Sequence, residues 1–374
     1  MACKAHDKRT SVIAIALFGL FICSFIYLID APSRPQLVGK GVLENGKLHD
    51  ISSSQADDLC EQYGWSTFKP ATHNAPRRKI YDMFLFNTEL DWLEIRMNEL
   101  KDHVDYFVIV EANTTFTNLP KPLHLEENWD RFKDFHHKMI RHTIQGQDPD
   151  EHDQWDHEIW QRNSMLTQAI PSLHGEQKAN PGDVLVVSDL DEIPRPDTMT
   201  LLRTCDFPRA VNLRSRFYYY SFQWIHRGRD WAHPQATYYQ GLENTILPHD
   251  LRYHAGGSLL TNWLTSSSDI WNASWHCSSC FDTINEMKTK IRSYSHQEFN
   301  RPEFLDSDKL VERVRTGMDL FDRPGQIYDR VDNNTDVPSF LKKNQERFRH
   351  LLDRDAPNAN FRDYHPENLE FEDV

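Results

Sequence analysis

The chain has 374 residues and a mass of 44.1 kDa, and 39% of its residues are hydrophobic. This apolar content is enough for one large domain or two small ones, and it excludes an intrinsically disordered protein. The sequence holds 42 Lys and Arg residues against 56 Asp and Glu residues, a formal net charge of −14. Such a balance argues against a nucleic-acid partner, because a nucleic-acid-binding surface needs clustered basic charge. Six cysteines are too few for a disulfide scaffold.

Residues 12–29 form an uncharged apolar run of 18 residues near the N-terminus. As a helix this run would be about 27 Å long, which matches the hydrocarbon core of a bilayer. Lys4, Lys8 and Arg9 precede the run. The positive-inside rule therefore predicts a cytosolic tail over residues 1–11 and a transmembrane signal anchor, with the rest of the chain across the membrane. A cleaved signal peptide is the alternative, but the run ends without a convincing small-residue cleavage site.

Three N-x-S/T sequons support a lumenal position for the body of the chain, because they are acceptors for N-glycosylation in secreted proteins. They begin at Asn113, Asn272 and Asn333. Thiols tend to oxidise in such a compartment, so disulfides are expected among the cysteines that follow the apolar run. Those four cysteines allow three pairings, and the sequence leaves the choice open: Cys60, Cys205, Cys277 and Cys280.

Residues 30–76 are predicted to form a stem, partly without regular structure, because Pro, Gly and Ser recur there. From residue 77 to residue 374 a single folded domain is expected, in which apolar runs alternate with segments of helical periodicity. The expected strands are residues 80–87, 106–111, 138–144 and 183–188, and the expected helices are residues 90–100 and 159–170. This alternation predicts an α/β fold with a mainly parallel central sheet. Residues 209–224 are typical of a long aromatic-rich β segment, and the C-terminal part looks helical.

The most informative pattern is the acidic segment that ends the apolar strand over residues 183–188. Asp189 and Asp191 follow the strand, and Glu192 comes directly after them. In open α/β sheets ligands bind at the carboxyl ends of the strands, and alternate residues share a face if the chain stays extended. Two such carboxylates suit a hard divalent cation that also binds phosphate oxygens. The alternative is an acidic loop that caps the helix expected from Pro196.

Five segments of the chain, taken together, resemble glycosyltransferase family 17. They are residues 82–90, 104–116, 188–194, 275–281 and 340–348. The resemblance implies a GT-A-like nucleotide-sugar-binding fold, a UDP-sugar donor, a divalent metal that is usually Mn²⁺, and inversion at the anomeric carbon. It also implies transfer of a sugar, N-acetylglucosamine, to a mannose-containing N-glycan of a glycoprotein. With the apolar run and the sequons, the expectation is a single-pass type II Golgi membrane protein whose catalytic domain, residues 77–374, is lumenal.

The resemblance also assigns expected roles at the metal and at the reacting atoms. Asp189 and Asp191 match the acidic pair of the family, Asp189 as a contact to the donor or the metal and Asp191 as a metal ligand. Asp191 and Glu192 are the expected catalytic residues. His276 is expected to complete the metal shell from the C-terminal part, although a histidine beside a tryptophan is more often a satisfied core residue.

Further residues are expected around the donor and the acceptor. Arg162 and Asn163, on the helix expected over residues 159–170, are assigned to the donor, since a guanidinium binds phosphate oxygens in a bidentate way. Arg162 could instead be a surface arginine in a helical ion pair. Glu111 is assigned to the nucleotide or its sugar, and its alternative is a structural hydrogen bond. Trp224 is assigned to the acceptor, because aromatic rings stack on sugars, and its alternative is the core.

Two other functions compete with a transferase. A phosphatase of the haloacid dehalogenase type also ends a buried strand with two aspartates, but there the motif usually opens the domain. An inactive, membrane-anchored glycan-binding protein is the second rival, and the intact acidic pair argues against it. The base that deprotonates the acceptor is not identified by the sequence. Glu192 is a candidate because it is close to the expected metal, and three others lie in the expected stretch of chain: Asp230, Glu243 and Asp269.

Overall fold

The computed structural model describes residues 52–70, 76–144, 154–253 and 267–365. The predicted tail, signal anchor and first part of the stem lie outside the described residues. Within the described ranges, no helix is long and apolar enough to span a membrane.

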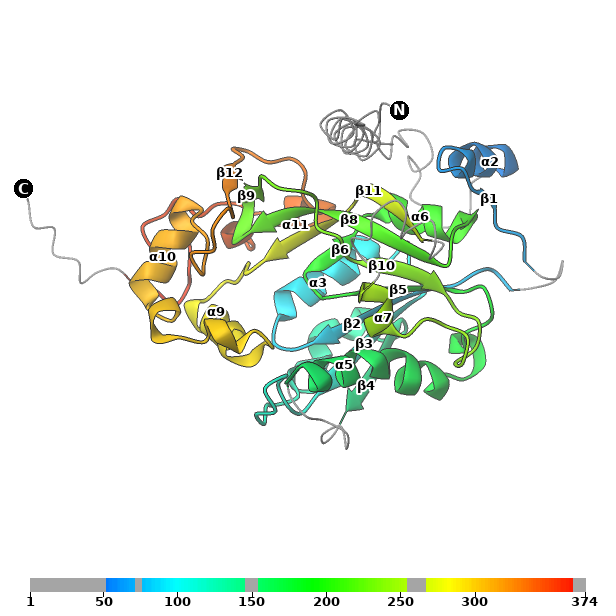
Figure 1. The fold of residues 1–374 in the computed structure, drawn as a ribbon, viewed down its shortest axis with the longest axis horizontal. Coiled ribbons are helices and arrows are strands. Elements are labelled where there is room, and N and C mark those ends of the chain that lie inside the picture. Colours follow the sequence, from blue (N-terminus) through cyan, green and yellow to red (C-terminus); the bar gives the residue numbers. More distant parts are fainter. Residues whose placement is uncertain (1–51, 71–75, 145–153, 254–266, 366–374) are drawn as a thin grey trace, which may run out of the picture.

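Four parallel strands form one half of a mixed sheet of ten strands (Figure 1). Their order across the sheet is β4 (Met139–Ile144), β3 (Tyr106–Ala112), β2 (Ile80–Phe86) and β5 (Val184–Ser188). Each neighbouring pair is parallel. These are the four strands predicted from buried apolar runs, and an α/β fold is confirmed.

The other half of the sheet corrects the prediction of a mainly parallel sheet. It contains β10 (Gln235–Tyr238), β8 (Ala210–Tyr219), β9 (Ser221–His226) and β12 (Tyr328–Arg330), each antiparallel to its neighbour. β11 (Ser267–Ser278) runs parallel to β8 and antiparallel to the short β6 (Glu192–Pro194). Antiparallel neighbours can be joined by a tight turn, and the chain reverses in this way between β8 and β9. β12 pairs with β9, and β10 with β5, from positions far away in sequence.

The aromatic segment 209–224 shows how that reversal works. Tyr220, at φ 63°, separates β8 from β9, so the predicted single β segment is two antiparallel strands. The C-terminal part is less helical than expected, because β11 is a strand of 12 residues. Its helices are short: α9 (Ile284–Ser293), α10 (Ser307–Thr316) and α11 (Ser339–Lys343).

Helices cover the two faces of the parallel strands, which alternate their side chains between two cores. α3 (Leu90–Leu100) packs with Ile80, Phe84 and Ile109 in the larger core. The opposite face of the same strands, including Tyr81, packs against residues 165–170, which continue α5 (Gln154–Ser164) as a π-helical turn, Met165–Ala169. Both predicted helices are therefore present. Because successive side chains of a strand point to opposite faces, alternate residues of the parallel strands pack into the two cores.

The remaining elements are short. The α-helices are α4 (His124–Glu127), α6 (Pro196–Thr204) and α7 (Pro248–Tyr253). The 3-10 helices are Trp129–Phe135, Ile170–Ser172, Gly175–Gln177, Gln297–Phe299, Pro302–Phe304 and Arg349–Leu351.

Ordered structure begins before residue 77, where the expected stem was to end. α2 (Ser53–Glu61) starts at a capping box on Ser52, and β1 (Ser66–Thr67) pairs with β7 (Cys205–Asp206). A disulfide between Cys60 and Cys205 fastens α2 to the body of the domain. The second disulfide joins Cys277 and Cys280, which answers the pairing question that the sequence left open.

Candidate functional site

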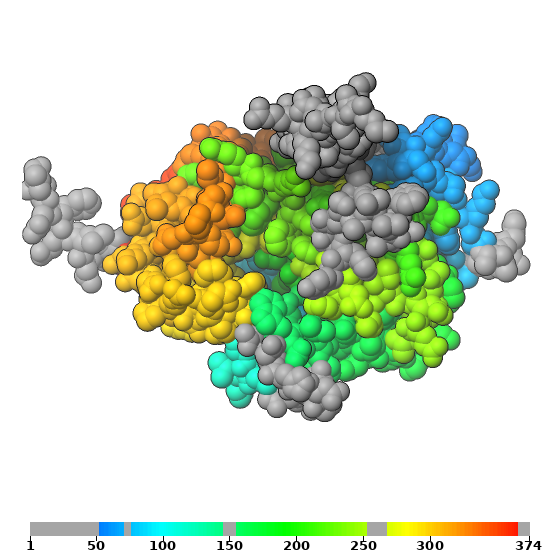
Figure 2. Space-filling view, viewed as in Figure 1, coloured from blue at the N-terminus to red at the C-terminus, as the bar shows by residue number. Residues whose placement is uncertain are grey.

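A cleft of about 440 Å³ opens at the carboxyl ends of the parallel strands. Residues at or just beyond the ends of β2, β3 and β5 line one side of it, and residues from α5, α7 and α9, with Trp231 and His233, line other sides. Figure 2 shows the surface hollowed between the yellow segment that contains α9 and the green segments that contain α5 and α7. This is the edge at which open α/β sheets bind ligands.

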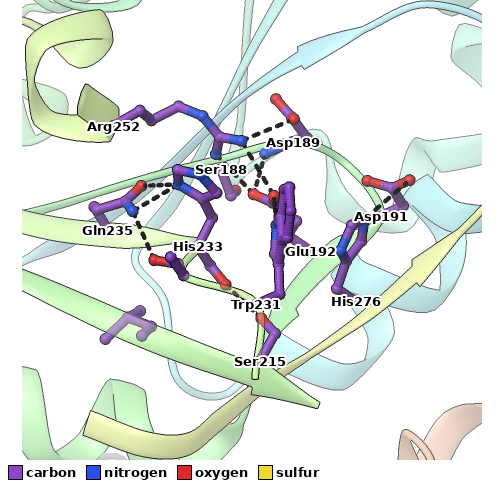
Figure 3. A network of polar contacts seen from close by, with 12 residues as sticks. Ser188, Asp189, Asp191, Glu192, Ser215, Trp231, His233, Gln235, Arg252 and His276 are labelled. Carbon is purple, nitrogen blue, oxygen red and sulfur yellow. Dashed lines mark hydrogen bonds and ion pairs between the residues drawn. The ribbon is translucent and has the colours of Figure 1, made fainter. Parts of the chain in front are cut away.

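The acidic segment after β5 is a turn, not a continuation of the strand. The Glu192 amide donates to the Asp189 carbonyl at 3.1 Å, which closes the turn over Leu190 and Asp191. Asp189 and Asp191 therefore point apart, Asp189 towards Arg252 and Asp191 towards His276 (Figure 3). The convergence expected for an extended segment does not occur, because an i to i+3 turn separates alternate side chains that a strand would align.

Arg96 of α3 holds this turn from inside the protein. Its side chain is fully buried and forms a two-point ion pair with Asp82, at 2.6 and 2.8 Å. The same guanidinium donates to the carbonyls of Asp189, Leu190 and Glu192, at 3.1, 3.2 and 2.8 Å. Five donors in a rigid plane can satisfy such a set of acceptors, so Arg96 is a positioning residue for the acidic turn.

Two arginines bind the Asp189 carboxylate, one on each oxygen. Arg162 donates to Oδ1 at 2.8 Å, and Arg252 donates to Oδ2 at 3.0 Å. Burial would raise the pKa of Asp189, but the two guanidiniums hold it well below its usual range. Asp189 is therefore a permanent anion that fixes two cations at the floor of the cleft.

Glu192 is the buried centre of the same network, with 1% of its side chain exposed. Arg252 donates to both of its oxygens, at 2.8 and 3.1 Å. The Trp231 indole and the Asp189 amide complete its hydrogen bonds, at 2.7 and 2.9 Å. Burial opposes ionisation, yet Arg252 lowers the pKa of Glu192 to about 2. A carboxylate held in this way ties α7 and Trp231 to the acidic turn.

His276 lies beside Asp191, with 3.8 Å between its Nε2 and the Asp191 Oδ2. The antiparallel pairing of β11 with β6 places it there, and the Cys277 amide donates to the Asp191 carbonyl at 3.2 Å. The His276 ring stacks on the Phe217 ring, with their centroids 4.8 Å apart. Burial would lower the pKa of His276, but Asp191 raises it above its usual value. Its Nδ1 is buried and has no hydrogen-bond partner among the described residues.

The three expected metal ligands are only partly together. Asp191 and His276 offer an oxygen and a nitrogen that are close neighbours, whereas both Asp189 oxygens are bound by arginines. In the described part of the chain, no group of three His, Cys, Asp or Glu side chains could hold a metal ion. Asp191 with His276 fits a cation that takes its other ligands from a bound substrate, as phosphate-binding cations often do.

The predicted donor residues lie at different depths. Arg162 lines the cleft, and its second partner is Glu158, at 2.7 Å. Asn163 does not line it, but its Oδ1 accepts the His249 amide at 3.0 Å and so anchors α7, which carries Arg252. Glu111 is buried and accepts the Leu125 amide at 2.9 Å, so it too stands outside the lining of the cleft.

Trp224, the expected acceptor residue, is buried in a separate aromatic core. Its indole donates to the Val314 carbonyl at 3.0 Å, and its exposed fraction is 7%. Trp231, by contrast, lines the cleft, as does Trp155 of α5. None of the candidates for the base lines the cleft, and Asp269 is paired with Arg214 at 2.9 Å.

The three sequons differ in their surroundings. Asn333 is exposed and lies in a turn at φ 51°. The Asn272 side chain accepts a hydrogen bond from Arg195 at 2.8 Å. The Asn113 Oδ1 is buried without a hydrogen-bond partner among the described residues. Of the three, Asn333 offers the most accessible amide for glycosylation.

The residues of the cleft that sequence reasoning missed include two lysines, an arginine and a tryptophan: Lys121, Lys290, Arg252 and Trp231. Lys290 of α9 forms an ion pair with Glu89 at 3.3 Å. None of them belongs to a recognisable motif, and each comes from a segment far from the acidic turn in sequence. The resemblance quoted for residues 275–281 ends shortly before Lys290, which is the nearest signal that could have indicated it.

Comparison with known proteins agrees with the resemblance. The human and rat proteins named beta-1,4-mannosyl-glycoprotein 4-beta-N-acetylglucosaminyltransferase are each 29% identical to this chain over 304 residues, and the mouse protein of that name is 28% identical. These alignments cover 74% of this chain and 55% of each relative, so the chain spans about half the length of the curated relatives. The profile of glycosyltransferase family 17 matches residues 47–357. The chain therefore belongs to glycosyltransferase family 17.

Proposed function

We propose that this chain is an inverting glycosyltransferase that moves N-acetylglucosamine from a UDP donor to a mannose residue of a glycoprotein N-glycan. The observation that carries the proposal is the cleft at the strand edge, where the family's acidic pair lies beside Arg162 and Arg252. The curated relatives carry the name of such a transferase. Membership of the family gives no support to the phosphatase alternative, and the intact site favours a catalyst over an inactive glycan-binding protein.

The two arginines account for binding of an anionic donor. A guanidinium forms two parallel hydrogen bonds with phosphate oxygens, and both guanidiniums lie where a diphosphate can approach the acidic turn. Asp189 keeps them in place by accepting one hydrogen bond from each. We assign Arg162 and Arg252 to the diphosphate and Asp189 to their orientation.

Asp191 differs from the other carboxylates of the cleft in its partners. Glu89, Glu158 and Asp189 each form an ion pair with a lysine or an arginine. Among the described residues, no lysine or arginine forms an ion pair with Asp191, and 21% of its side chain is exposed. Its oxygens are therefore available to a divalent cation, with His276 beside it. When bound, such a cation, Mn²⁺ by resemblance, would supply positive charge against the leaving diphosphate.

The proposed reaction is a single displacement, in which the acceptor hydroxyl attacks the anomeric carbon from the face opposite the diphosphate. An α-linked donor then gives a β-linked product. Trp231 is our candidate for a surface that an acceptor sugar contacts, because its ring lines the cleft beside the acidic turn. An indole fixed at its nitrogen presents a rigid apolar face to a sugar.

The cellular setting of the proposal is a Golgi membrane with the catalytic domain in the lumen. The apolar run over residues 12–29 and the exposed sequon at Asn333 support it. Expression in a eukaryotic secretory cell should give protein that loses mass on treatment with an N-glycosidase, and Asn333→Gln should remove one increment of that mass. An unglycosylated body that cytosolic protease can reach would contradict the proposal.

The decisive experiment is a donor and metal screen with the full chain in detergent. Calorimetry should show that UDP binds in the presence of Mn²⁺ and more weakly after EDTA. Transfer to a mannose-containing N-glycan should be fastest with UDP-N-acetylglucosamine. Equal or better use of UDP-glucose or UDP-galactose would contradict the donor, and equal UDP binding with and without metal would contradict the cation.

A further inference from the structure

A short hairpin follows β3 and forms one wall of the cleft. The Thr115 amide donates to the Leu119 carbonyl at 2.8 Å, and the Lys121 amide donates to the Asn113 carbonyl at 2.9 Å. Thr114 and Pro120 form the bridge between the two arms. Backbone bonds at both ends of the hairpin fix where the Lys121 side chain leaves the chain, and that side chain lines the cleft.

The Lys121 ammonium is buried and has incomplete partners. Only 9% of the side chain is exposed, and the Nζ makes no hydrogen bond within the described residues. Its ion-pair partner is Glu111, whose Oε1 is 3.8 Å away, beyond hydrogen-bond distance. An ammonium group carries three donors, and a buried donor without an acceptor is costly. The cost is removed if a ligand in the cleft supplies the acceptor.

Neutralisation of Glu111 does not by itself explain this arrangement. The Glu111 Oε1 already accepts the Leu125 amide, and its Oε2 is buried without a hydrogen-bond partner in the described part of the chain. A lysine placed only to satisfy that carboxylate would be expected to donate to it directly. The ammonium instead lies 3.8 Å from the nearest Glu111 oxygen and is buried, while the Lys121 side chain lines the cleft.

The position of Lys121 separates it from the diphosphate end of the cleft. It follows β3, whereas the arginine-bound Asp189 follows β5, and β2 lies between those two strands in the sheet. Glu89, which follows β2, pairs with Lys290 in that interval. A nucleotide whose phosphates lie beside Asp189 can therefore extend its nucleoside along the strand ends to the hairpin.

We propose that Lys121 donates a hydrogen bond to the O4 carbonyl oxygen of the uracil base of the nucleotide, and so selects uracil over cytosine. Uracil carries a keto oxygen at the position where cytosine carries an amino group, and an ammonium is a donor that cannot accept from that amino group. A buried donor left facing another donor penalises the wrong base. This inference rests on the proposed UDP-sugar transferase and names the residue that reads the base.

The test compares UDP and CDP binding to the full chain and its variants by calorimetry, under one set of metal and salt conditions. Lys121→Met should weaken UDP binding by roughly tenfold or more, because a hydrogen bond to a charged group is lost, while CDP binding changes little. Lys309→Met is the matched control, since Lys309 is exposed on α10 outside the cleft, and it should leave both affinities unchanged. Lys121→Gln, which keeps a neutral donor, should retain part of the selectivity.

The outcomes separate this inference from the function on which it rests. Wild-type protein that binds no UDP overturns both. Wild-type protein that binds UDP, with an unchanged ratio of UDP to CDP affinity in Lys121→Met, overturns the role of Lys121 alone. A lower melting temperature with that ratio unchanged would show that Lys121 serves only Glu111, and would also overturn it. If Lys121→Met does not fold, the ratio of UDP to CDP affinity in Lys121→Gln decides the question. A Lys121→Gln variant with the full selectivity of the wild type would show that the ammonium is not needed, and would overturn the inference.

Discussion

Replacement of Arg252 by methionine should destabilise the protein by an amount that the structure allows us to work out. The guanidinium forms hydrogen bonds to both oxygens of Glu192, whose side chain is 1% exposed. Burial alone would raise the pKa of Glu192, and Arg252 instead lowers it to about 2 from an ordinary 4.5. A fall of this size corresponds to about 3 kcal/mol of preference for the ionised carboxylate in the folded protein. We therefore expect Arg252→Met to lower the free energy of unfolding by about 3 kcal/mol at pH 7.

The assay is urea unfolding of four proteins: the wild type, Arg252→Met, Glu192→Gln and the double variant. Because the two side chains contact each other, the loss in the double variant should be smaller than the sum of the single losses by roughly 2 kcal/mol. Arg227→Met is the control, since the Arg227–Asp329 ion pair is exposed on both sides, and it should leave stability unchanged. Additive losses, or an Arg252→Met variant as stable as the control, would refute the reasoning.

The pH dependence gives a second readout of the same pair. The folded pKa of Glu192 is depressed, so its stabilising contribution is fully present above the unfolded pKa of about 4.5. It is lost as the pH falls towards the folded value of about 2. Glu192→Gln should therefore show a shallower loss of stability than the wild type over that window. Identical acid-unfolding profiles for the two proteins would contradict the assigned pKa.

The other predictions concern residues around the same site and the two disulfides. Replacing both cysteines of Cys60–Cys205, which closes a separation of 145 residues, should cost up to about 5 kcal/mol in urea unfolding, against about 1.5 kcal/mol for Cys277–Cys280. Burial lowers the pKa of His233 to about 4, so wild-type stability should decline as the pH falls from about 6.5 to about 4, and His233→Gln should flatten that decline. Arg96→Met should lower the free energy of unfolding by about 3–5 kcal/mol, because it leaves a buried aspartate unpaired, and Arg96→Lys should not restore it. Asp191→Asn should fold with wild-type stability in the same assay and lose transfer on the order of a thousandfold; near-normal turnover would contradict its assignment to the metal.

The four parallel strands and the two helices around them were predictable from local pattern. β2, β3 and β5 are largely apolar runs buried on both faces, whereas the edge strand β4 is buried only in part. α3 shows apolar residues at helical spacing. Each of these signals lies within a single segment, so periodicity is enough to find it. The acidic pair was found for the same reason, since it directly follows a buried strand.

The conformation of the acidic turn could not be predicted from the same pattern. Whether Asp189 and Asp191 converge depends on Arg96, which binds the turn from a helix about 93 residues earlier in the chain. The residues next to Arg96 in sequence do not indicate this contact. Arg252 approaches from the other side, 63 residues later. Hydrogen bonds over such separations leave no local periodicity.

The sequence by itself determined the family, the α/β class, the strand that carries the acidic pair and the cation at Arg162. Only the tertiary structure decided that half of the sheet is antiparallel or mixed, that Trp224 is buried while Trp231 lines the cleft, and that Arg252 and Lys121 also line it. The physical reason is the range of the interactions. Helix and strand propensity and apolar periodicity act between residues a few positions apart, whereas the pairing of distant strands and the burial of charge depend on how whole elements pack together.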